Sequence, residues 1–329
     1  MSEARGFWWR SAGAGEILGE PLGVLGQGEC LIAARCSSIS LGTERLVATG
    51  QVPEAMGEAM RCPHMGGAFP FPVKYGYSLV GEVIEGPAWL LGRLVHALHP
   101  HQDRCRVAAA EVFEVPEGVT EERATLASNL ETAVTALWDA RVLVGERALV
   151  VGFGIVGSLI ARLLASVPGV RLVVADSSPE KLAMAQAMGF EATAPGELSG
   201  GFDLAFHASG SSGGLQASID QVGFEGRVIE VSWYGSRAVE VHLGATFHSQ
   251  RKSILCSQVS NLPPHQRGRW DYRRRKALVF DLLKDPGFDA HLTDRIAFEA
   301  LPGWFSRALA DPPVSLAQLV VYEGQVERA

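Results

Sequence analysis

Glycines near the middle of the chain form the pattern with the clearest chemical meaning. The segment Gly-Phe-Gly-Ile-Val-Gly at residues 152–157 follows the apolar run 148–151 and precedes a helix-compatible stretch. In such a strand-to-helix turn the first glycine permits a tight turn, the second lets the backbone approach a pyrophosphate, and the third lets the helix pack on the strand. The helix N-terminal amides then face the anion. The expected cofactor contacts in this turn are Gly152, Gly154, Ile155, Val156 and Gly157.

An acidic residue at the end of the next apolar run indicates which dinucleotide binds. Asp176 follows the run 170–175, at a spacing where a carboxylate accepts hydrogen bonds from the adenosine ribose. The same carboxylate repels a 2′-phosphate, and Ser177 and Ser178 follow without an arginine to receive one. We therefore expect NAD(H), with NADP(H) disfavoured.

Two alternative interpretations of this segment are a turn without a ligand and a flavin site. A plain glycine-rich turn followed by a helix-capping Asp176 would carry no ligand, but strand, turn, helix, strand and acid occur here in the order that a dinucleotide site requires. A flavin cofactor is disfavoured, because flavin-binding Rossmann folds usually carry the glycine motif at the N-terminus of the chain, whereas here it lies near the middle.

The elements around this motif predict an α/β fold. Residues 29–119 contain short β-type runs separated by glycine and proline, whereas from about residue 127 apolar runs alternate with helical stretches, as in βαβ units. The expected strands of the first part are 30–36, 78–84, 93–98 and 104–108. The expected strands of the second part are 148–151, 170–175, 203–207 and 227–232, with helices at 155–166, 179–188 and 213–222. A helix at 272–284 and a strand at 317–322 form a tail that could return to the first domain.

Length and composition agree with a globular protein of two domains. The chain has 329 residues, 47% of them hydrophobic and 20% charged, and a net charge of −7, which does not favour nucleic acid as a partner. No apolar run reaches the about 18 residues needed to cross a membrane, and the N-terminus lacks the apolar stretch of a signal peptide. We expect a cytoplasmic protein. The basic cluster at residues 267–276 is interpreted as a solvated face or a subunit contact.

Several local segments resemble the medium-chain dehydrogenase/reductase superfamily. They are Ser-Leu-Gly-Thr-Glu at 40–44, Lys-Tyr-Gly-Tyr-Ser-Leu-Val-Gly-Glu-Val at 74–83, Asn-Leu-Glu-Thr-Ala at 129–133, and residues 176–189. The chain is most similar to the zinc-lacking branch that includes bacteriochlorophyllide 2-hydroxyethyl dehydrogenase. The resemblance implies a β-rich GroES-like catalytic domain at 1–127 completed by 263–329, a doubly wound Rossmann domain at 128–262, and a homodimer.

The resemblance also implies that the catalytic zinc is missing. The cysteine ligand of the zinc enzymes falls on Ser40 or Leu41, and the histidine ligand falls on Tyr77. Only Glu131 still resembles a ligand, whereas a catalytic zinc needs about three protein ligands. The five scattered cysteines contain no CxxC, so no zinc ribbon is indicated. A different metal site from Cys62 and His64, or from His99, His101 and Cys105, is disfavoured by the spacing.

Without a metal, the alkoxide formed by hydride transfer needs hydrogen-bond donors. The resemblance places Thr43, Tyr77 and His99 near the substrate oxygen as catalytic candidates. It places Ser40, Glu44, His101 and Glu131 in the substrate pocket, and Thr132, Ser177, Ser209 and Trp233 at the cofactor. Plainer alternatives are capping or pairing by Thr43 and Glu44, filling of the metal space by Tyr77, and an ordinary loop position for His99. Trp233 and its neighbour Tyr234, which the resemblance places at the nicotinamide, could instead pack in the core.

The resemblance implies an oxidoreductase that interconverts a secondary alcohol and a ketone on a small or ring-bearing substrate. The alternatives are a quinone or activated-alkene reductase of the same superfamily, and a dinucleotide-binding protein without catalysis.

Overall fold

A computed structural model describes residues 3–322. Two compact units are present: one holds the N-terminal part up to Ser128 and the C-terminal part from Phe280, and the other is Asn129–Val279. The domain boundaries expected from the sequence, at 127/128 and 262/263, remain a prediction, and residues 323–329 of the expected first domain lie outside the described residues. Residues 263–279 group with the second unit, in which Arg275 and Lys276 form ion pairs with Glu131.

The first unit is built on two β-sheets. A four-stranded sheet has the order β2-β1-β5-β4, and a seven-stranded sheet has the order β16-β17-β3-β6-β7-β9 with β8 paired to β3. The strands are β1 (Glu3–Ser11), β2 (Ala14–Pro21), β3 (Glu29–Ile39), β4 (Gly66–Gly67), β5 (Val73–Lys74), β6 (Leu79–Glu85), β7 (Leu94–Ala97), β8 (Arg104–Ala108), β9 (Phe113–Glu114), β16 (Leu292–Ala297) and β17 (Ala317–Val321). The four strands expected between residues 30 and 108 are observed as β3, β6, β7 and β8. The C-terminal β17 pairs antiparallel with β3, so the tail of the chain belongs to this sheet.

Aromatic packing holds the first hairpin in the core of the first unit. Phe7 and Trp9 of β1 are each about fully buried and contact Phe305 at ring-centroid distances of 5.1 and 4.9 Å. Phe305 lies on α9 (Leu301–Ala310), so a helix from the C-terminal part anchors the N-terminal strands. The other helices of this unit are α1 (Leu41–Ala48) and α2 (Glu121–Ala124).

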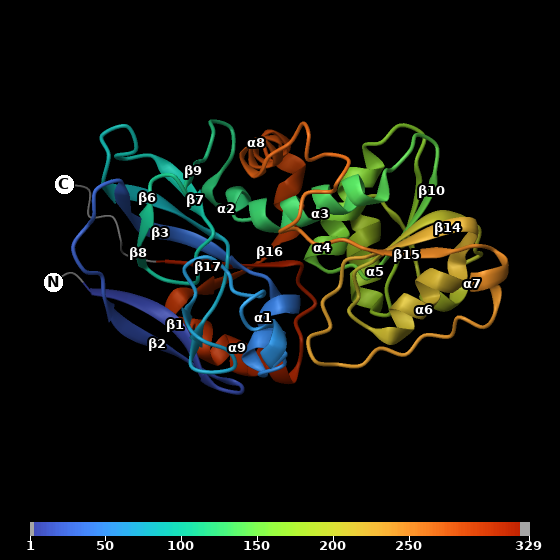
Figure 1. Ribbon diagram of the computed structural model, residues 1–329, viewed down its shortest axis with the longest axis horizontal. Helices are drawn as coiled ribbons and strands as arrows, with labels where there is room; N and C mark the ends of the chain where they lie inside the picture. Colours follow the sequence, from blue (N-terminus) through green and yellow to red (C-terminus); the bar gives the residue numbers. More distant parts are fainter. Residues whose placement is uncertain (1–2, 323–329) are drawn as a thin grey trace. The chain divides into compact units, whose positions relative to one another are not determined.

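The second unit contains a six-stranded parallel sheet of order β12-β11-β10-β13-β14-β15 (Figure 1). The strands are β10 (Arg147–Val151), β11 (Arg171–Ala175), β12 (Glu191–Thr193), β13 (Phe202–His207), β14 (Val222–Glu230) and β15 (Ser253–Cys256). The order runs outward in both directions from β10 and β13, which is the order of a doubly wound Rossmann sheet. The expected fold class is therefore confirmed.

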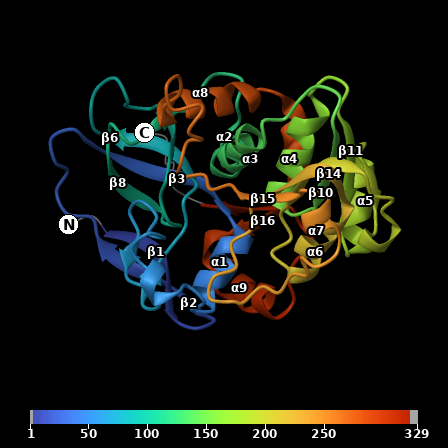
Figure 2. The ribbon, with the colours of Figure 1, turned by 45° about the vertical axis from the view of Figure 1, so that its right-hand side comes forward.

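Helices cover both faces of this sheet (Figures 1 and 2). Leu149 and Val151 of β10 pack in one apolar cluster with Leu215 of α6 (Ser212–Gln221). The side chain of Val150 points to the other face, where it lies against Gly157 of α4 (Ile155–Ala165). This alternation explains why the strand is apolar at nearly every position. The remaining helices are α3 (Ala127–Ala140), which begins in the first unit, α5 (Pro179–Ala187), α7 (Thr246–Ser249) and α8 (Tyr272–Leu282), which ends in the first unit.

Among residues 3–322, no helix combines the length and apolar character needed to span a membrane.

Candidate functional site

The glycine turn after β10 has the geometry that a dinucleotide needs. Gly152 has φ +100°, and a Cβ on it would lie 2.6 Å from the backbone nitrogen of Ser209. A Cβ on Gly157 would lie 1.9 Å from the carbonyl oxygen of Gly152, so this glycine is required for helix α4 to approach the strand. A Cβ on Gly154 would meet nothing within 4 Å, which leaves room in front of the α4 N-terminus. The three glycines thus fit the roles of tight turn, helix packing and pyrophosphate approach.

Asp176 lies directly beside this turn. Its Oδ2 accepts from the Phe153 backbone N–H at 2.7 Å, and its Oδ1 accepts from the Ser178 backbone N–H at 2.9 Å. Each carboxylate oxygen keeps a second lone pair for another donor, because an ionised carboxylate accepts about four hydrogen bonds. Ser177 is exposed next to it. The residues of this unit therefore fit an adenine dinucleotide whose ribose binds Asp176.

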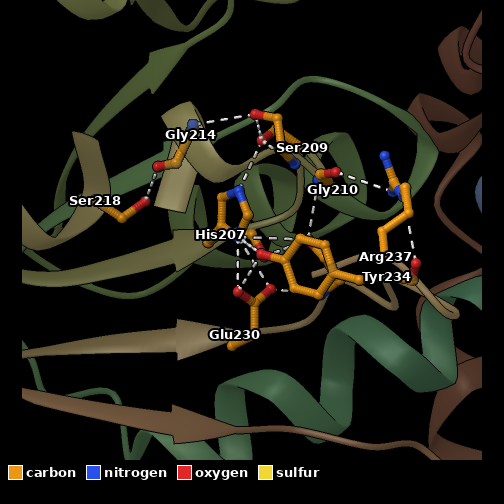
Figure 3. Close-up of polar contacts among 10 residues, drawn as sticks. His207, Ser209, Gly210, Gly214, Ser218, Glu230, Tyr234 and Arg237 are labelled. Carbon is orange, nitrogen blue, oxygen red and sulfur yellow. Dashed lines mark hydrogen bonds and ion pairs between the residues drawn. The ribbon is translucent and has the colours of Figure 1, made fainter. Parts of the chain in front are cut away.

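A buried histidine and glutamate meet at the carboxyl ends of β13 and β14 (Figure 3). His207 Nδ1 lies 2.9 Å from Oε2 of Glu230, and His207 Nε2 lies 2.7 Å from Oγ of Ser209. Glu230 also accepts from the Tyr234 hydroxyl at 2.8 Å and from the Ser232 backbone N–H at 2.8 Å. Burial raises the pKa of the Glu230 carboxyl, but the hydrogen bonds from His207, Tyr234 and Ser232 outweigh it, so the net shift is downward.

Sequence reasoning named Ser209, Trp233 and Tyr234 in this region and missed His207 and Glu230. The available signal was an ionisable residue ending each of two apolar strands. Ser209 is exposed and joins the His207 network, whereas Trp233 is half-buried between Ser232 and Tyr234.

Glu131 is bound by two cations rather than left open as a ligand. Its Oε1 lies 3.2 Å from Nε of Arg275 and its Oε2 lies 2.6 Å from Nζ of Lys276, and all three side chains are buried. Arg275 also donates to the Thr135 hydroxyl and to the Val259 carbonyl. Burial lowers the pKa of Lys276, and the charge of Glu131 opposes that shift.

This cluster corrects one interpretation of the sequence. The basic residues at 267–276 are not all on a solvated face: Arg275 and Lys276 are 4% and 2% exposed. Arg267, Arg269, Arg273 and Arg274 are exposed, as expected. The helical period of α8 turns the side chains of Arg275 and Lys276 inward, where the Glu131 carboxylate compensates their charge. Thr132, the neighbour of Glu131 on α3, is half-buried.

In the first unit the structure brings Ser40, Thr43 and Tyr77 together. The Tyr77 hydroxyl donates to Oγ1 of Thr43 at 3.4 Å and is hydrogen-bonded to the Ser40 side chain. Burial raises the pKa of Tyr77 to about 12, although these two hydrogen bonds act in the opposite direction. Tyr77 is therefore a protonated hydroxyl at neutral pH, in a group of hydroxyl side chains.

Glu44 and His101 form a second buried pair behind this group. His101 Nε2 lies 3.1 Å from Oε2 of Glu44, while His101 Nδ1 lies 2.7 Å from Oγ of Ser37, which also contacts the Tyr322 hydroxyl at 2.9 Å. The other Glu44 oxygen accepts from the Ser40 backbone N–H at 2.8 Å and so caps the start of α1. Glu44 and His101 are each 1% exposed, so both act as internal supports of the Ser40–Thr43 turn.

His99 is held as a neutral imidazole. Its Nδ1 lies 2.9 Å from the carbonyl oxygen of Pro100 and must donate to it, so Nε2 carries a lone pair. Burial lowers the pKa of His99 to about 3. The ring stacks on His64 at 5.2 Å, and Nε2 of His64 lies 3.0 Å from Glu111. In this form His99 accepts a hydrogen bond more readily than it delivers a proton.

The cysteine and histidine residues considered as a metal site do not form one. Cys62 donates its thiol to the Gly76 carbonyl, and burial raises the pKa of that thiol to about 12. Within the part of the chain that the structure describes, no group of three or more histidine, cysteine or acidic side chains is arranged to hold a metal ion.

Comparison with known proteins identifies relatives of limited similarity. No protein-family model matches the sequence. The chain is 29% identical over 176 residues to YphC, an uncharacterized zinc-type alcohol dehydrogenase-like protein of Escherichia coli K12, with 49% of each chain covered. It is 25% identical over 228 residues to the D-guloside 3-dehydrogenase of Shigella flexneri, covering 63% of this chain and 65% of that enzyme. The chain thus spans about half of the first relative and slightly less than two thirds of the second.

Solved structures share the architecture over nearly the whole chain. The 2R,3R-butanediol dehydrogenase of Bacillus subtilis superposes with a TM-score of 0.78 at 18% identity, covering 97% of this chain and 99% of that one. Two further structures each give a TM-score of 0.76, with 98% of this chain and 100% of each structure covered. One is a putative zinc-binding dehydrogenase of Sinorhizobium meliloti 1021 bound to NADP, at 16% identity. The other is a short chain alcohol dehydrogenase of Escherichia coli CFT073 complexed with NADH, at 15% identity. The fold is thus a Rossmann sheet combined with a β-rich GroES-like domain, and the relatives support the medium-chain dehydrogenase/reductase superfamily.

Proposed function

We propose that the protein is a zinc-independent, NAD(H)-dependent oxidoreductase that interconverts a secondary alcohol and a ketone. The observation that carries this proposal is the β10 turn, where Gly154 leaves open space at the α4 N-terminus and Asp176 keeps free lone pairs beside it. A backbone shaped in this way suits a pyrophosphate, and the adjacent carboxylate suits an unphosphorylated ribose. The dehydrogenase names of both relatives agree with this activity.

Zinc independence rests on the residues that stand where a zinc enzyme has ligands. Ser40 or Leu41 stands at the position of the cysteine ligand, and Tyr77 stands at the position of the histidine ligand. Glu131, the third, is neutralised by Arg275 and Lys276, so its oxygens already have cationic partners. A zinc ion would have to displace these buried cations.

The proton is proposed to come from the first unit. When bound, the nicotinamide ring supplies or accepts the hydride. In the direction of reduction, Tyr77 gives the substrate oxygen the proton that it shares with Thr43 in this structure, because burial keeps the hydroxyl protonated. Thr43 orients the Tyr77 hydroxyl, and His99 Nε2 accepts a hydrogen bond from a substrate hydroxyl.

The proposed substrate is a small or ring-bearing secondary alcohol. The zinc-lacking branch that the sequence resembles suggests a bulky ring, and the D-guloside 3-dehydrogenase relative suggests a sugar ring.

We also propose a homodimer. The outer strand β15 has all four residues exposed, including Ile254 and Leu255, and an open sheet edge of this kind is suited to pairing with a second copy.

The decisive experiment is NADH oxidation with a panel of ketones, ketosugars, quinones and activated alkenes. Reduction of a ketone, with the reverse reaction on the alcohol and NAD⁺, would support the proposal. Turnover of quinones or alkenes alone would instead identify a reductase of the same superfamily. Tight NADH binding without any hydride transfer would identify a non-catalytic dinucleotide-binding protein.

A further inference from the structure

Ser209, His207 and Glu230 form a chain of two hydrogen bonds that ends at an exposed hydroxyl (Figure 3). Oγ of Ser209 lies 2.7 Å from Nε2 of His207, and Nδ1 of the same ring lies 2.9 Å from Oε2 of Glu230. Enzymes with a nucleophilic serine use this order of groups, from hydroxyl through both imidazole nitrogens to a carboxylate. Because the arrangement occurs on unrelated folds, its geometry identifies it and the surrounding fold does not.

The carboxylate fixes the direction of both hydrogen bonds. The pKa of the Glu230 carboxyl is lowered on balance despite its burial, so the group is ionised at neutral pH and can only accept. His207 therefore donates from Nδ1, and in the neutral ring Nε2 is an acceptor. The Ser209 hydroxyl must then donate to Nε2, which places His207 as a general base for the serine proton.

The three side chains differ in exposure as such a site requires. His207 is 0% and Glu230 is 9% exposed, whereas Ser209 is exposed and can meet a molecule from solution. The Ser211 backbone N–H, 3.3 Å from Oγ of Ser209, occupies one lone pair of that oxygen. The Ser211 hydroxyl, 2.9 Å away, is itself exposed, so its proton can turn toward water and free the other lone pair for attack.

Backbone N–H groups at the start of α6 can stabilise an oxyanion. Ser212 and Gly213 begin this helix, and within the described part of the chain their N–H groups have no hydrogen-bond partner. A Cβ on Gly213 would meet nothing within 4 Å, so the space beside it is open. A Cβ on Gly214 would lie 2.1 Å from Oγ of Ser209, so the hydroxyl lies against the same helical turn. A negative charge that develops on a substrate oxygen there meets free donors and the positive end of the helix dipole.

We propose that Ser209, His207 and Glu230 form a second active site, which hydrolyses small carboxylic esters. Oγ of Ser209 attacks the ester carbonyl carbon while His207 Nε2 takes the hydroxyl proton, and His207 then gives this proton to the departing alcohol. Water next attacks the acyl ester of Ser209: His207 takes a proton from the water and returns it to Oγ as the carboxylic acid leaves. Water is the only co-reactant.

Glu230 is a positioning residue in this reaction. It holds His207 in the tautomer with the proton on Nδ1 and stabilises the imidazolium that forms after proton transfer. The ester hydrolysis needs no dinucleotide, so it is independent of the proposed oxidoreductase activity.

The test is reaction of the full chain with a fluorophosphonate, which phosphonylates an activated serine and releases fluoride, followed by peptide mass spectrometry. No dinucleotide is added, because the turn at Gly152 adjoins Ser209. We expect labelling of Ser209, and hydrolysis of p-nitrophenyl acetate that the same reagent abolishes. Ser209→Ala should abolish the labelling and lower hydrolysis by at least about 100-fold.

Control variants separate this chemistry from a general effect on the fold, which circular dichroism monitors in each of them. Ser249→Ala, which changes an exposed serine of the same unit, should alter neither labelling nor hydrolysis. Glu230→Gln should slow both by about 10²- to 10⁴-fold, because an amide does not hold the required tautomer. Tyr234→Phe removes a different hydrogen bond to Glu230 and should keep most of the rate.

The outcomes are distinct. No labelling of Ser209, or hydrolysis that persists in Ser209→Ala, would overturn the inference. Equal rates in Glu230→Gln and Tyr234→Phe would overturn the role of Glu230. NADH oxidation is measured separately, so failure of the ester hydrolysis and failure of the proposed function are told apart.

Discussion

The Glu131 carboxylate lies 2.6 Å from Nζ of Lys276, and both side chains are buried. With Arg275 on the other oxygen, two cations surround one anion in the interior of the second unit. Desolvated charges of this kind persist only while they compensate one another. The residue that resembles a metal ligand in the sequence is therefore part of the structural framework.

Replacing Glu131 should destabilise the protein. Glu131→Gln leaves Arg275 and Lys276 buried without a counter-charge, which typically costs about 3–5 kcal/mol. Urea unfolding followed by circular dichroism measures this change. The exposed Glu240→Gln is the matched control and should stay within about 0.5 kcal/mol of the wild type. An equally small effect of Glu131→Gln would show that the ion cluster contributes nothing to stability.

The purified protein should contain far less than one zinc per chain. Ser40, Leu41 and Tyr77 offer no soft ligand, and Glu131 is already paired. Elemental analysis and dialysis against a chelator test this, and activity should survive the chelator. One zinc per chain, whose removal abolishes activity and whose return restores it, would refute zinc independence.

NADH should bind at least about tenfold more tightly than NADPH, because Asp176 accepts from an unmodified ribose and repels a 2′-phosphate. Asp176→Ala should remove most of this difference in parallel titrations of both cofactors. Glu180→Gln, which removes an exposed charge nearby on α5, should keep the preference. A preference that persists in Asp176→Ala would assign the discrimination to other residues.

Tyr77→Phe should lower turnover of an identified ketone by about 10²- to 10⁴-fold, the usual effect of losing a general acid. Cofactor affinity should not change, because the proposed role of Tyr77 is at the substrate oxygen, whereas the glycine turn and Asp176 are proposed to hold the cofactor. His99→Ala should act mainly on KM, because His99 is in the acceptor form. Normal turnover in Tyr77→Phe would mean that the proton comes from another group.

The pH dependence gives an independent test of Tyr77. Burial raises its folded-state pKa to about 12, so the hydroxyl keeps its proton throughout the neutral range and loses it only as the pH approaches that value. Reduction rates should show no alkaline limb from Tyr77 below about pH 10. A limb near pH 8 that disappears in Tyr77→Phe would contradict the buried, protonated state.

Ile254→Glu should convert the proposed dimer to a monomer in sedimentation experiments, because a charge on the open edge strand β15 opposes pairing. The control is Ile84→Glu on β6 of the other unit. Ile84 is 45% exposed and Ile254 is 38% exposed, so the two substitutions place a charge on similarly exposed residues. An unchanged dimer would place the interface elsewhere.

Local pattern was sufficient to predict much of the fold. The strands β10, β11 and β13 and the helices α4 and α5 begin and end within one or two residues of expectation, because burial on both faces leaves nearly continuous apolar runs and serine, proline and glycine mark the helix starts. The short strands β12 and β15 were not predicted, since three or four residues carry too little periodicity. The hairpin β1–β2 was also missed, although its aromatic residues proved to be core.

The glycine turn after β10 and the position of Asp176 beside it could be predicted from the sequence itself, because a βαβ unit places these residues within about 30 positions and its geometry is local. The pairing of His207 with Glu230, and of Glu131 with Arg275 and Lys276, was decided only by the tertiary structure. His207 and Glu230 meet because β13 and β14 are neighbours in the sheet. Arg275 and Lys276 reach Glu131 because they lie on the buried face of α8, and Glu131 and Lys276 are 145 positions apart in the sequence. Charge compensation depends on that proximity, and a single sequence does not encode it in any local spacing.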